Sequence, residues 1–477
     1  MSASIATGPA PTPAAPEAPA GSDDPEASGA SDASGSGLAP PGRLERFLQR
    51  VDPAWVSVAL FAVALVVYVG SNLGRADRYD HFVWQADAFL HGRTEIAWPV
   101  SEGPYRNDHF QDVLPIPGTG LGQIPFPPLP AIVLLPFVAV FGLGTSGAAV
   151  AAVLGAVNVV LCWVMLLGVT PRRSAALLGT VFYGFGTVAW YAAMLGTTWF
   201  LAHVVASTFL FLAISVAVRA DRGQRQRRRG LGSQLAAGLL FGTAALARLT
   251  TILGAPFFLF VGAGGSWWRR AASAGVGAAI PLGLLLAYNV ATTGHLFHPA
   301  YEYLYQVEYR PRPELIDPEW GIEDLRYVPQ NAGIMLAWPP ERPLFDDPAC
   351  TTRPIGLDRL LSTDCPLLRP DPLGMSMLLT SPAYLLAVPA LVYLWRRRLV
   401  AGAALAVLAI ALIDLMHFSQ GWVQFGYRFS NDFAPFAIIL ATLGIARLGV
   451  GIRSLGLVAL SVAVNAWGVW WGVTLGW

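Results

Sequence analysis

Charged residues are concentrated in one short segment of a chain that is otherwise strongly apolar. Residues 74–93 read GRADRYDHFVWQADAFLHGR and carry three aspartates, two histidines and three arginines. Over the whole chain, 54% of the residues are hydrophobic and only 13% are charged. Because charge is costly to place at a membrane, ionisable groups in such chains are usually kept for function. A carboxylate held there can act as a general base toward a hydroxyl group or bind a cation.

Residues 78–93 have the spacing of an amphipathic helix. One face of this helix would carry Asp80, Trp84, Asp87 and His91, and the opposite face is apolar. We expect the helix to lie in the membrane interface, with its apolar face toward the lipid and its carboxylates toward water. One interpretation is a carboxylate at the mouth of a membrane cavity. The other is an ordinary solvated polar face on a helix beside the membrane.

Further polar residues stand near the ends of apolar segments, on the side where the aspartate helix is expected. They are His203, Arg248, Tyr288, Asn289 and Arg428, whereas Asp112 stands in a polar stretch of the segment 106–142. A single polar residue in a bundle of membrane helices most often makes a structural hydrogen bond. The common side of these residues favours a shared site.

The composition is that of an all-α polytopic membrane protein. A soluble domain would carry about a quarter charged residues. Crossing the hydrocarbon core takes ~20 apolar residues, and twelve runs reach or approach this length. They fall near 54–71, 128–142, 147–168, 174–194, 197–218, 234–247, 249–264, 271–291, 374–394, 399–416, 432–450 and 455–474.

Arginines set the predicted orientation, because basic residues favour the cytoplasmic side. All 31 basic residues are arginines, and their clusters are expected inside. These clusters lie near 43–50, 172–173, 225–229, 269–270 and 396–398. The N-terminus is therefore expected in the cytoplasm.

The same orientation places two large loops outside, 72–125 and 292–373. An odd number of crossings must join the first loop to the inside pair 172–173, yet two apolar runs lie between them. The short run 128–142, which follows PFPPLP, is the one expected to re-enter rather than cross. We expect about 11 crossings, within a range of roughly 10 to 13, and a C-terminus outside.

The chain divides into four predicted parts. They are a disordered cytoplasmic tail at 1–42, an N-terminal membrane module at 43–291, an outside cap at 292–373, and C-terminal membrane helices at 374–477. Cys350 and Cys365 lie in the cap and are expected to form a disulfide if it faces an oxidising compartment.

Several short motifs resemble the GT-C superfamily of polytopic membrane glycosyltransferases. They are the spacing Ala86-x-x-x-Leu90-x-Gly92 after the first span, the Pro-Pro-Leu segment 127–129, and Gly426–Arg428 before a late span. The resemblance runs from residue 54 to about residue 440 through short, degenerate motifs. The superfamily includes protein O-mannosyltransferases and the aminoarabinose transferases that modify lipid A.

This resemblance implies a mechanism at the outer face of the membrane. A polyprenyl-phosphate sugar is the donor, and a first-loop carboxylate deprotonates the acceptor hydroxyl. The sugar is transferred with inversion, and arginines stabilise the charge on the departing lipid phosphate. No cofactor is certain, but Mg²⁺ or Mn²⁺ is possible because some members use a divalent metal. The acceptor stays open between lipid, polysaccharide and protein.

Many members carry an adjacent Asp-Glu pair where this chain has Arg78 and Tyr79, flanked by Asp77 and Asp80. Asp80 is the expected base, followed by Asp77 and Asp87, with Asp112 as an outsider. The residues expected to bind the donor or acceptor are Arg78, Arg93, Asp112, His203, Arg248, Tyr288, Asn289, Tyr301 and Arg428.

Two other function classes fit parts of the sequence. A transporter or flippase for a lipid or small solute would explain the spans and the intramembrane polar groups, although no repeat between the halves and no Walker motif is found. A scaffold would explain the spans but not the acidic helix. The resemblance favours a transferase of the bacterial plasma membrane, with an extracytoplasmic active site and no nucleic-acid partner.

Overall fold

The computed structural model describes residues 42–73, 79–97, 112–225, 230–306, 320–421 and 423–477, without the side chains of 223–225. The predicted disordered tail at 1–42 therefore lies almost wholly outside the described residues, as do Asp77 and Arg78.

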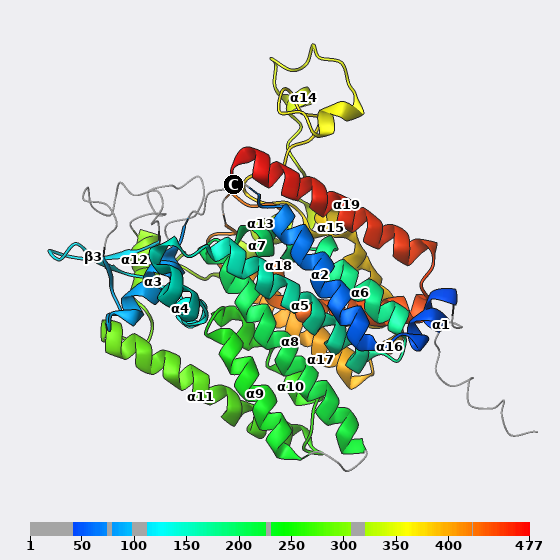
Figure 1. The fold of residues 1–477 in the computed structure, drawn as a ribbon, viewed down its shortest axis with the longest axis horizontal. Helices are drawn as coiled ribbons and strands as arrows, with labels where there is room; N and C mark the ends of the chain where they lie inside the picture. Colours follow the sequence, from blue (N-terminus) through cyan, green and yellow to red (C-terminus); the bar gives the residue numbers. More distant parts are fainter. Residues whose placement is uncertain (1–41, 74–78, 98–111, 226–229, 307–319, 422) are drawn as a thin grey trace, which may run out of the picture. The chain divides into compact units, whose positions relative to one another are not determined.

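Helices make up most of the described chain (Figure 1). The α-helices are α1 (Arg43–Arg50), α2 (Pro53–Gly70), α3 (His81–Leu90), α4 (Leu129–Phe141), α5 (Gly147–Val169), α6 (Arg173–Gly186), α7 (Ala189–Leu195), α8 (Thr198–Arg225), α9 (Leu231–Ala245), α10 (Pro256–Phe260), α11 (Trp267–Thr293), α12 (Ala300–Leu304), α13 (Val328–Ala337), α14 (Pro343–Asp346), α15 (Met377–Thr380), α16 (Val388–Leu394), α17 (Arg398–Met416), α18 (Ser430–Leu448) and α19 (Ile452–Leu475). The 3₁₀ helices are η2 (Gly142–Gly144), η3 (Leu249–Gly254), η5 (Leu325–Tyr327), η6 (Leu357–Leu360) and η7 (Pro382–Ala387).

Every predicted apolar run is helical, which confirms an all-α polytopic membrane protein. Within the described part of the chain, 7 helices are long and apolar enough to cross a membrane. The number rises to 8 if α6 and α7, bent by 50°, form one span. Four shorter apolar segments, at Leu129–Gly144, Leu231–Ala245, Leu249–Phe260 and Pro382–Leu394, leave the expected count of about 11 crossings a prediction.

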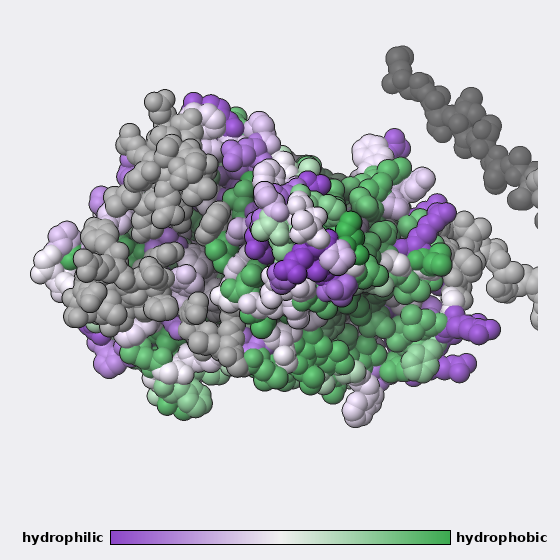
Figure 2. Space-filling view, turned by 90° about the horizontal axis from the view of Figure 1, so that it is seen from above, coloured by the Kyte–Doolittle hydropathy of each residue, from purple (hydrophilic) through white to green (hydrophobic). Residues whose placement is uncertain are grey.

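Burial differs strongly between the spans. In α18, 89% of the apolar segment is buried, whereas in α2 the share is 17%. An apolar helix that is buried all round belongs to the interior, and one that is mostly exposed must face lipid. Figure 2 shows apolar side chains over much of the visible surface, with hydrophilic side chains in several separate groups.

Helix α4 supports the re-entrant interpretation of 128–142. Near the end of α5, the Trp163 indole N–H donates to the Pro53 carbonyl at the start of α2 (3.4 Å), so the two helices run in opposite directions. The start of α5 therefore lies at the end of α2 that leads into the first loop. There, Asp80 Oδ1 is 3.8 Å from the position of a Cβ on Gly147. Since α4 connects this loop to the start of α5, the arrangement agrees with a segment that re-enters, which stays a prediction.

The first loop combines a helix with a small sheet. Strands β1 (Ile96–Ala97), β3 (Leu121–Gln123) and β2 (Leu114–Ile116) pair antiparallel in that order. Helix α3 confirms the helix expected within 78–93. Its apolar residues Phe82, Val83 and Ala86 pack against α4 and the bundle. Even polar His81 and Gln85 are completely buried, because other parts of the chain cover α3.

The loop expected as a cap contains helices α12, α13 and α14. The structure joins Cys350 and Cys365 in a disulfide, with Cα atoms 5.3 Å apart. The indole groups of Trp467 and Trp471 on α19 donate to the Leu360 carbonyl at 3.0 and 3.3 Å. These bonds attach the disulfide-bonded part of the loop to α19.

Candidate functional site

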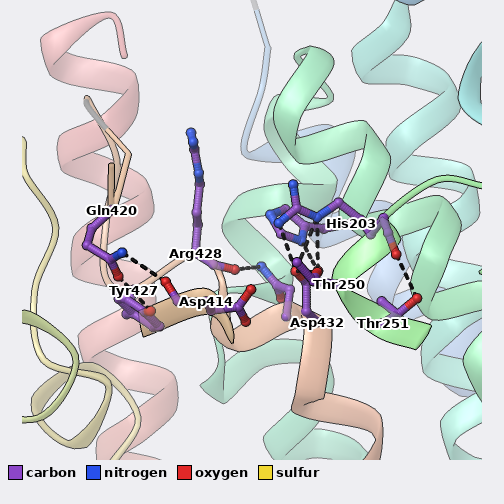
Figure 3. A network of polar contacts seen from close by, with 10 residues as sticks. His203, Thr250, Thr251, Asp414, Gln420, Tyr427, Arg428 and Asp432 are labelled. Atoms are coloured by element: carbon purple, nitrogen blue, oxygen red, sulfur yellow. Dashed lines mark hydrogen bonds and ion pairs between the residues drawn. The ribbon is translucent and has the colours of Figure 1, made fainter. Parts of the chain in front are cut away.

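A buried ionic cluster lies at the start of α18, formed by His203, Arg248, Thr250 and Asp432 (Figure 3). Asp432 is 1% exposed, and its carboxylate accepts from Arg248 Nη2 at 2.8 Å. It also accepts from Thr250 Oγ1 and from His203 Nδ1, both at 2.7 Å. We call these four residues the Asp432 cluster. A buried carboxylate needs this many donors, since an uncompensated charge inside a protein costs several kcal/mol.

A break in the helical path positions Arg248. Helix α9 ends at Ala245, Arg248 adopts an extended backbone, and η3 begins at Leu249. Arg248 therefore turns toward α18 instead of following the helix surface. Asp432 lies in the first turn of α18, where the helix dipole favours negative charge.

His203 presents its second ring nitrogen to a small cavity. Because a carboxylate only accepts, Nδ1 carries the proton toward Asp432. Nε2 is buried without a hydrogen-bond partner in the described residues. The cavity beside the ring has a volume of about 10 Å³, and Tyr183, Ser207 and Asn431 are among its lining residues. This is about the volume that one water molecule needs.

A second carboxylate, Asp414, adjoins the Asp432 cluster from α17. It is 2% exposed, and its Oδ2 atom has no hydrogen-bond partner within the described ranges. Asp414 interacts electrostatically with both Asp432 and Arg248. Both carboxyl groups therefore lie near the guanidinium group of Arg248.

Phe429 separates two guanidinium groups. Arg248 lies over its ring at 5.3 Å and Arg428 at 5.1 Å from the centroid. Arg428 also lies 6.0 Å from the Trp199 ring, and its side chain extends away from Asp432 (Figure 3). Aromatic ring faces attract cations. The Phe429 ring therefore keeps the guanidinium groups of Arg248 and Arg428 close to each other.

Trp199, at the start of α8, connects this region to the first loop. Its indole N–H donates to Asp112 Oδ2 at 2.9 Å, and its ring centroid is 5.0 Å from that of Tyr79. Asp112 and Tyr79 both have positive φ, at 62° and 58°. Residues other than glycine rarely adopt this backbone conformation, and those that do cluster at functional sites. We call Tyr79, Asp112, Trp199 and Arg428 the Trp199 cluster.

Asp80 and Asp87 occupy different surroundings from those expected. Asp80 precedes α3, and Oδ1 lies beside the start of α5, where a helix favours negative charge. Asp87 is 3.6 Å from His91 on the same helix. Thr198 instead ties the loop to α8, because its hydroxyl donates to the Tyr79 carbonyl and lies 2.8 Å from His81 Nδ1.

The other expected binding residues divide into two sets. Tyr301 lies within electrostatic reach of Arg248 and Asp112, so it belongs to the candidate site. Tyr288 accepts from Gln85 on α3 at 3.2 Å, and Asn289 donates to the Leu296 carbonyl. These two residues fasten loops to the end of α11. Arg93 follows α3 and is half-buried.

Sequence reasoning missed Asp414, Asp432, Thr250 and Trp199. A signal existed for the two aspartates, since each lies inside or at the edge of an apolar run, where ionisable residues are rare and usually functional. Among the residues that the structure describes, no group of three or more His, Cys, Asp or Glu is placed to hold a metal ion.

No protein-family model matches this chain, and no curated protein matches it. Among solved structures, the chain is similar to ArnT from Cupriavidus metallidurans bound to undecaprenyl phosphate. This chain resembles ArnT in its fold alone. The TM-score is 0.47 and the sequence identity is 16%. The alignment covers 87% of this chain and 64% of ArnT, so this chain spans less than two thirds of that protein's length.

Proposed function

We propose that this chain is a GT-C-type membrane glycosyltransferase, which moves a sugar from a polyprenyl-phosphate donor to an acceptor hydroxyl at the extracytoplasmic face. One observation carries the proposal. Arg248 and Arg428, from distant parts of the sequence, lie over the same Phe429 ring, next to a buried carboxylate of the first loop. This arrangement provides positive charge for a phosphate and a base for a hydroxyl in one region.

The arginines are proposed to hold the donor phosphate. Arg248 uses Nε and Nη2 for Asp432, which fixes the orientation of its guanidinium group. Arg428 lies over aromatic rings, where it can present its planar fork to phosphate oxygens. The apolar surfaces of the spans would accommodate the polyprenyl chain in the bilayer.

Asp112 is the strongest candidate for the base among the described residues. It is 7% exposed, has a strained backbone, and shares Trp199 with Arg428. In the proposed step, Asp112 takes the proton of the acceptor hydroxyl, whose oxygen attacks the anomeric carbon. The bond between that carbon and the phosphate oxygen breaks with inversion. Its electron pair leaves on the lipid phosphate, whose charge the arginines stabilise.

The test compares Asp→Asn variants in cells that lack the chain, using mass spectrometry of their glycolipids and glycans. We expect Asp112→Asn to lower transfer at least about 10²-fold, the usual contribution of a general base. Asp80→Asn and Asp87→Asn test the earlier ranking, and Asp346→Asn on exposed α14 is the matched control. Full transfer by Asp112→Asn would exclude Asp112 as the base. No change in any glycan on loss of the whole chain would overturn the proposed function.

The proposed location is the bacterial plasma membrane, with the N-terminus in the cytoplasm and the site outside. A transporter is the second candidate, because the Asp432 cluster and Asp414 place charge within the bundle. Purified protein in liposomes distinguishes the two. Sugar transfer from an undecaprenyl-phosphate-linked donor supports the enzyme, whereas solute uptake without such a donor supports a transporter.

A further inference from the structure

A groove lies between α2, α5 and α8, at the opposite end of α8 from the Trp199 cluster. These helices pack side by side (Figure 1). The groove has a volume of about 390 Å³ and is lined by Pro53, Ala54, Ser57, Trp163, Val164, Leu167, Gly168, Arg219 and Arg222. Residues 199 and 219 are separated by roughly 30 Å along an α-helix at 1.5 Å per residue. The groove is therefore separate from the proposed site.

The walls of the groove are largely apolar, and α2 forms one of them. Because the apolar segment of α2 is only 17% buried, most of this helix faces outward. Trp163 is buried, and its hydrogen bond to the Pro53 carbonyl joins α5 to α2. The groove thus opens on the part of the bundle that faces acyl chains.

Two arginines stand at this groove on α8. Arg219 and Arg222 are exposed and three residues apart, so they lie on the same face of the helix. Arg222 Nη1 lies 3.5 Å from the Leu167 carbonyl, which places its guanidinium group at the groove.

We propose that this groove binds an anionic phospholipid of the cytoplasmic leaflet. Its phosphodiester would lie between Arg219 and Arg222, and an acyl chain would lie along Val164 and Leu167. Guanidinium groups suit phosphate oxygens, and the apolar walls suit hydrocarbon. The arginine clusters place this end of the bundle on the cytoplasmic side, where the membrane surface is negatively charged. The groove therefore joins the two chemistries that such a lipid requires.

Native mass spectrometry of the full chain in detergent tests the proposal. Delipidated protein is mixed with phosphatidylglycerol or phosphatidylcholine of identical acyl chains. We expect wild type to retain phosphatidylglycerol preferentially, and Arg219→Gln with Arg222→Gln to lower its retention about tenfold or more, since each arginine near an anionic headgroup contributes. Ala54→Trp, which fills the groove without changing charge, is expected to lower retention as well.

The matched control is Arg397→Gln with Arg453→Gln, which removes two exposed arginines from the same predicted side but outside the groove. Equal thermal stability of all variants shows that they fold. The proposal is overturned if the groove variants retain phosphatidylglycerol as the control does, or if phosphatidylcholine is retained equally. Competition by millimolar inorganic phosphate alone would also overturn it, because the site would then bind free phosphate rather than a lipid.

Discussion

At the scale of single residues, the three donor residues around Asp432 explain why a carboxylate can lie inside an apolar bundle. Arg248 supplies the compensating charge, and His203 and Thr250 occupy the remaining acceptor positions. Arg428 lies over the Phe429 ring, 5.1 Å from the centroid, and its proposed role is to hold the donor phosphate. The two arginines should therefore respond differently to substitution.

Arg248→Gln is expected to destabilise the fold by about 3–5 kcal/mol, because it leaves Asp432 as a buried charge without its cation. Adding Asp432→Asn should recover part of this loss, since the unpaired charge of Asp432 is then removed. Thermal unfolding in detergent measures both effects. Additive losses in the double variant would show that the pair is not coupled.

Arg428→Gln should lower stability less than Arg248→Gln does, because Arg248 is the cation that pairs with the buried Asp432. Loss of charge stabilisation on the leaving phosphate should lower transfer about 10²-fold or more. Arg447→Gln, which removes a similar cation over Tyr393 at 5.4 Å, is the control for stacking alone. If Arg428→Gln binds undecaprenyl phosphate and transfers sugar as wild type does, Arg428 does not take part in donor binding.

At the scale of elements, α9 and α11 pack through glycines that allow the backbones to touch. A Cβ on Gly238 would lie 2.0 Å from the Ala274 carbonyl oxygen, and one on Gly277 would lie 2.2 Å from that of Leu235. Small residues at such positions are typical of membrane helix pairs. This pairing supports η3, and with it Arg248.

Gly238→Ala is therefore expected to cost about 1–3 kcal/mol, because the backbones must separate. Gly275→Ala on α11 is the matched control, since nothing lies within 4 Å of its added Cβ. The control should be neutral or stabilising, as alanine favours helix more than glycine does. Equal unfolding temperatures for both variants would contradict the close packing of α9 on α11.

Glu45 joins α1 to the start of α6 and makes this junction sensitive to pH. Its carboxylate accepts from the Ser174 amide at 2.8 Å and from the Arg173 amide at 3.1 Å. Burial raises the pKa of Glu45, but hydrogen bonds from Ser174 and Arg173 outweigh it, so the pKa lies below its ordinary value. The stabilisation is therefore complete above the ordinary pKa and is lost as the pH falls through the lowered one.

Glu45→Gln should cost about 2 kcal/mol at pH 7, the value of hydrogen bonds to a charged group. The difference from wild type should shrink as the pH falls through the acid range in which Glu45 is protonated. Thermal unfolding from pH 7 downward measures it, with exposed Glu302→Gln as the control. A difference that does not change with pH would show that the charge of Glu45 contributes nothing.

At the scale of the whole molecule, the two ends of the bundle carry different chemistry. The Trp199 cluster lies at the end of the first loop, and the arginine groove lies at the other end of α8. This polarity depends on α4 returning to the side from which it started. If α4 crossed the membrane, the start of α5 and the first loop would face opposite compartments.

Cysteine labelling of intact cells tests this topology. Gly118→Cys in the hairpin turn and Gly144→Cys after α4 should both react with an impermeant reagent from outside. Arg397→Cys should react only after permeabilisation. The native background is low, because Cys162 is buried and Cys350 and Cys365 are bonded to each other. Labelling of Gly144→Cys only in permeabilised cells would show that α4 crosses.

The sequence by itself determined the helices, because hydropathy over ~20 residues is a local property and each predicted apolar run is helical. It also indicated Arg248, Arg428, His203 and Tyr301, which the structure gathers near one another. Polar groups at the ends of helices can be recognised without knowing their neighbours.

Only the tertiary structure decided which polar groups meet. The spacing of 78–93 could not show that α4 covers α3, or that Asp80 lies beside α5 while Asp112 reaches Trp199. Likewise, Asp432 acquires its role from His203 and Arg248, which are 229 and 184 residues away along the chain. Such partnerships depend on which helices pack together, and packing follows from side-chain shape across the whole bundle rather than from any local pattern.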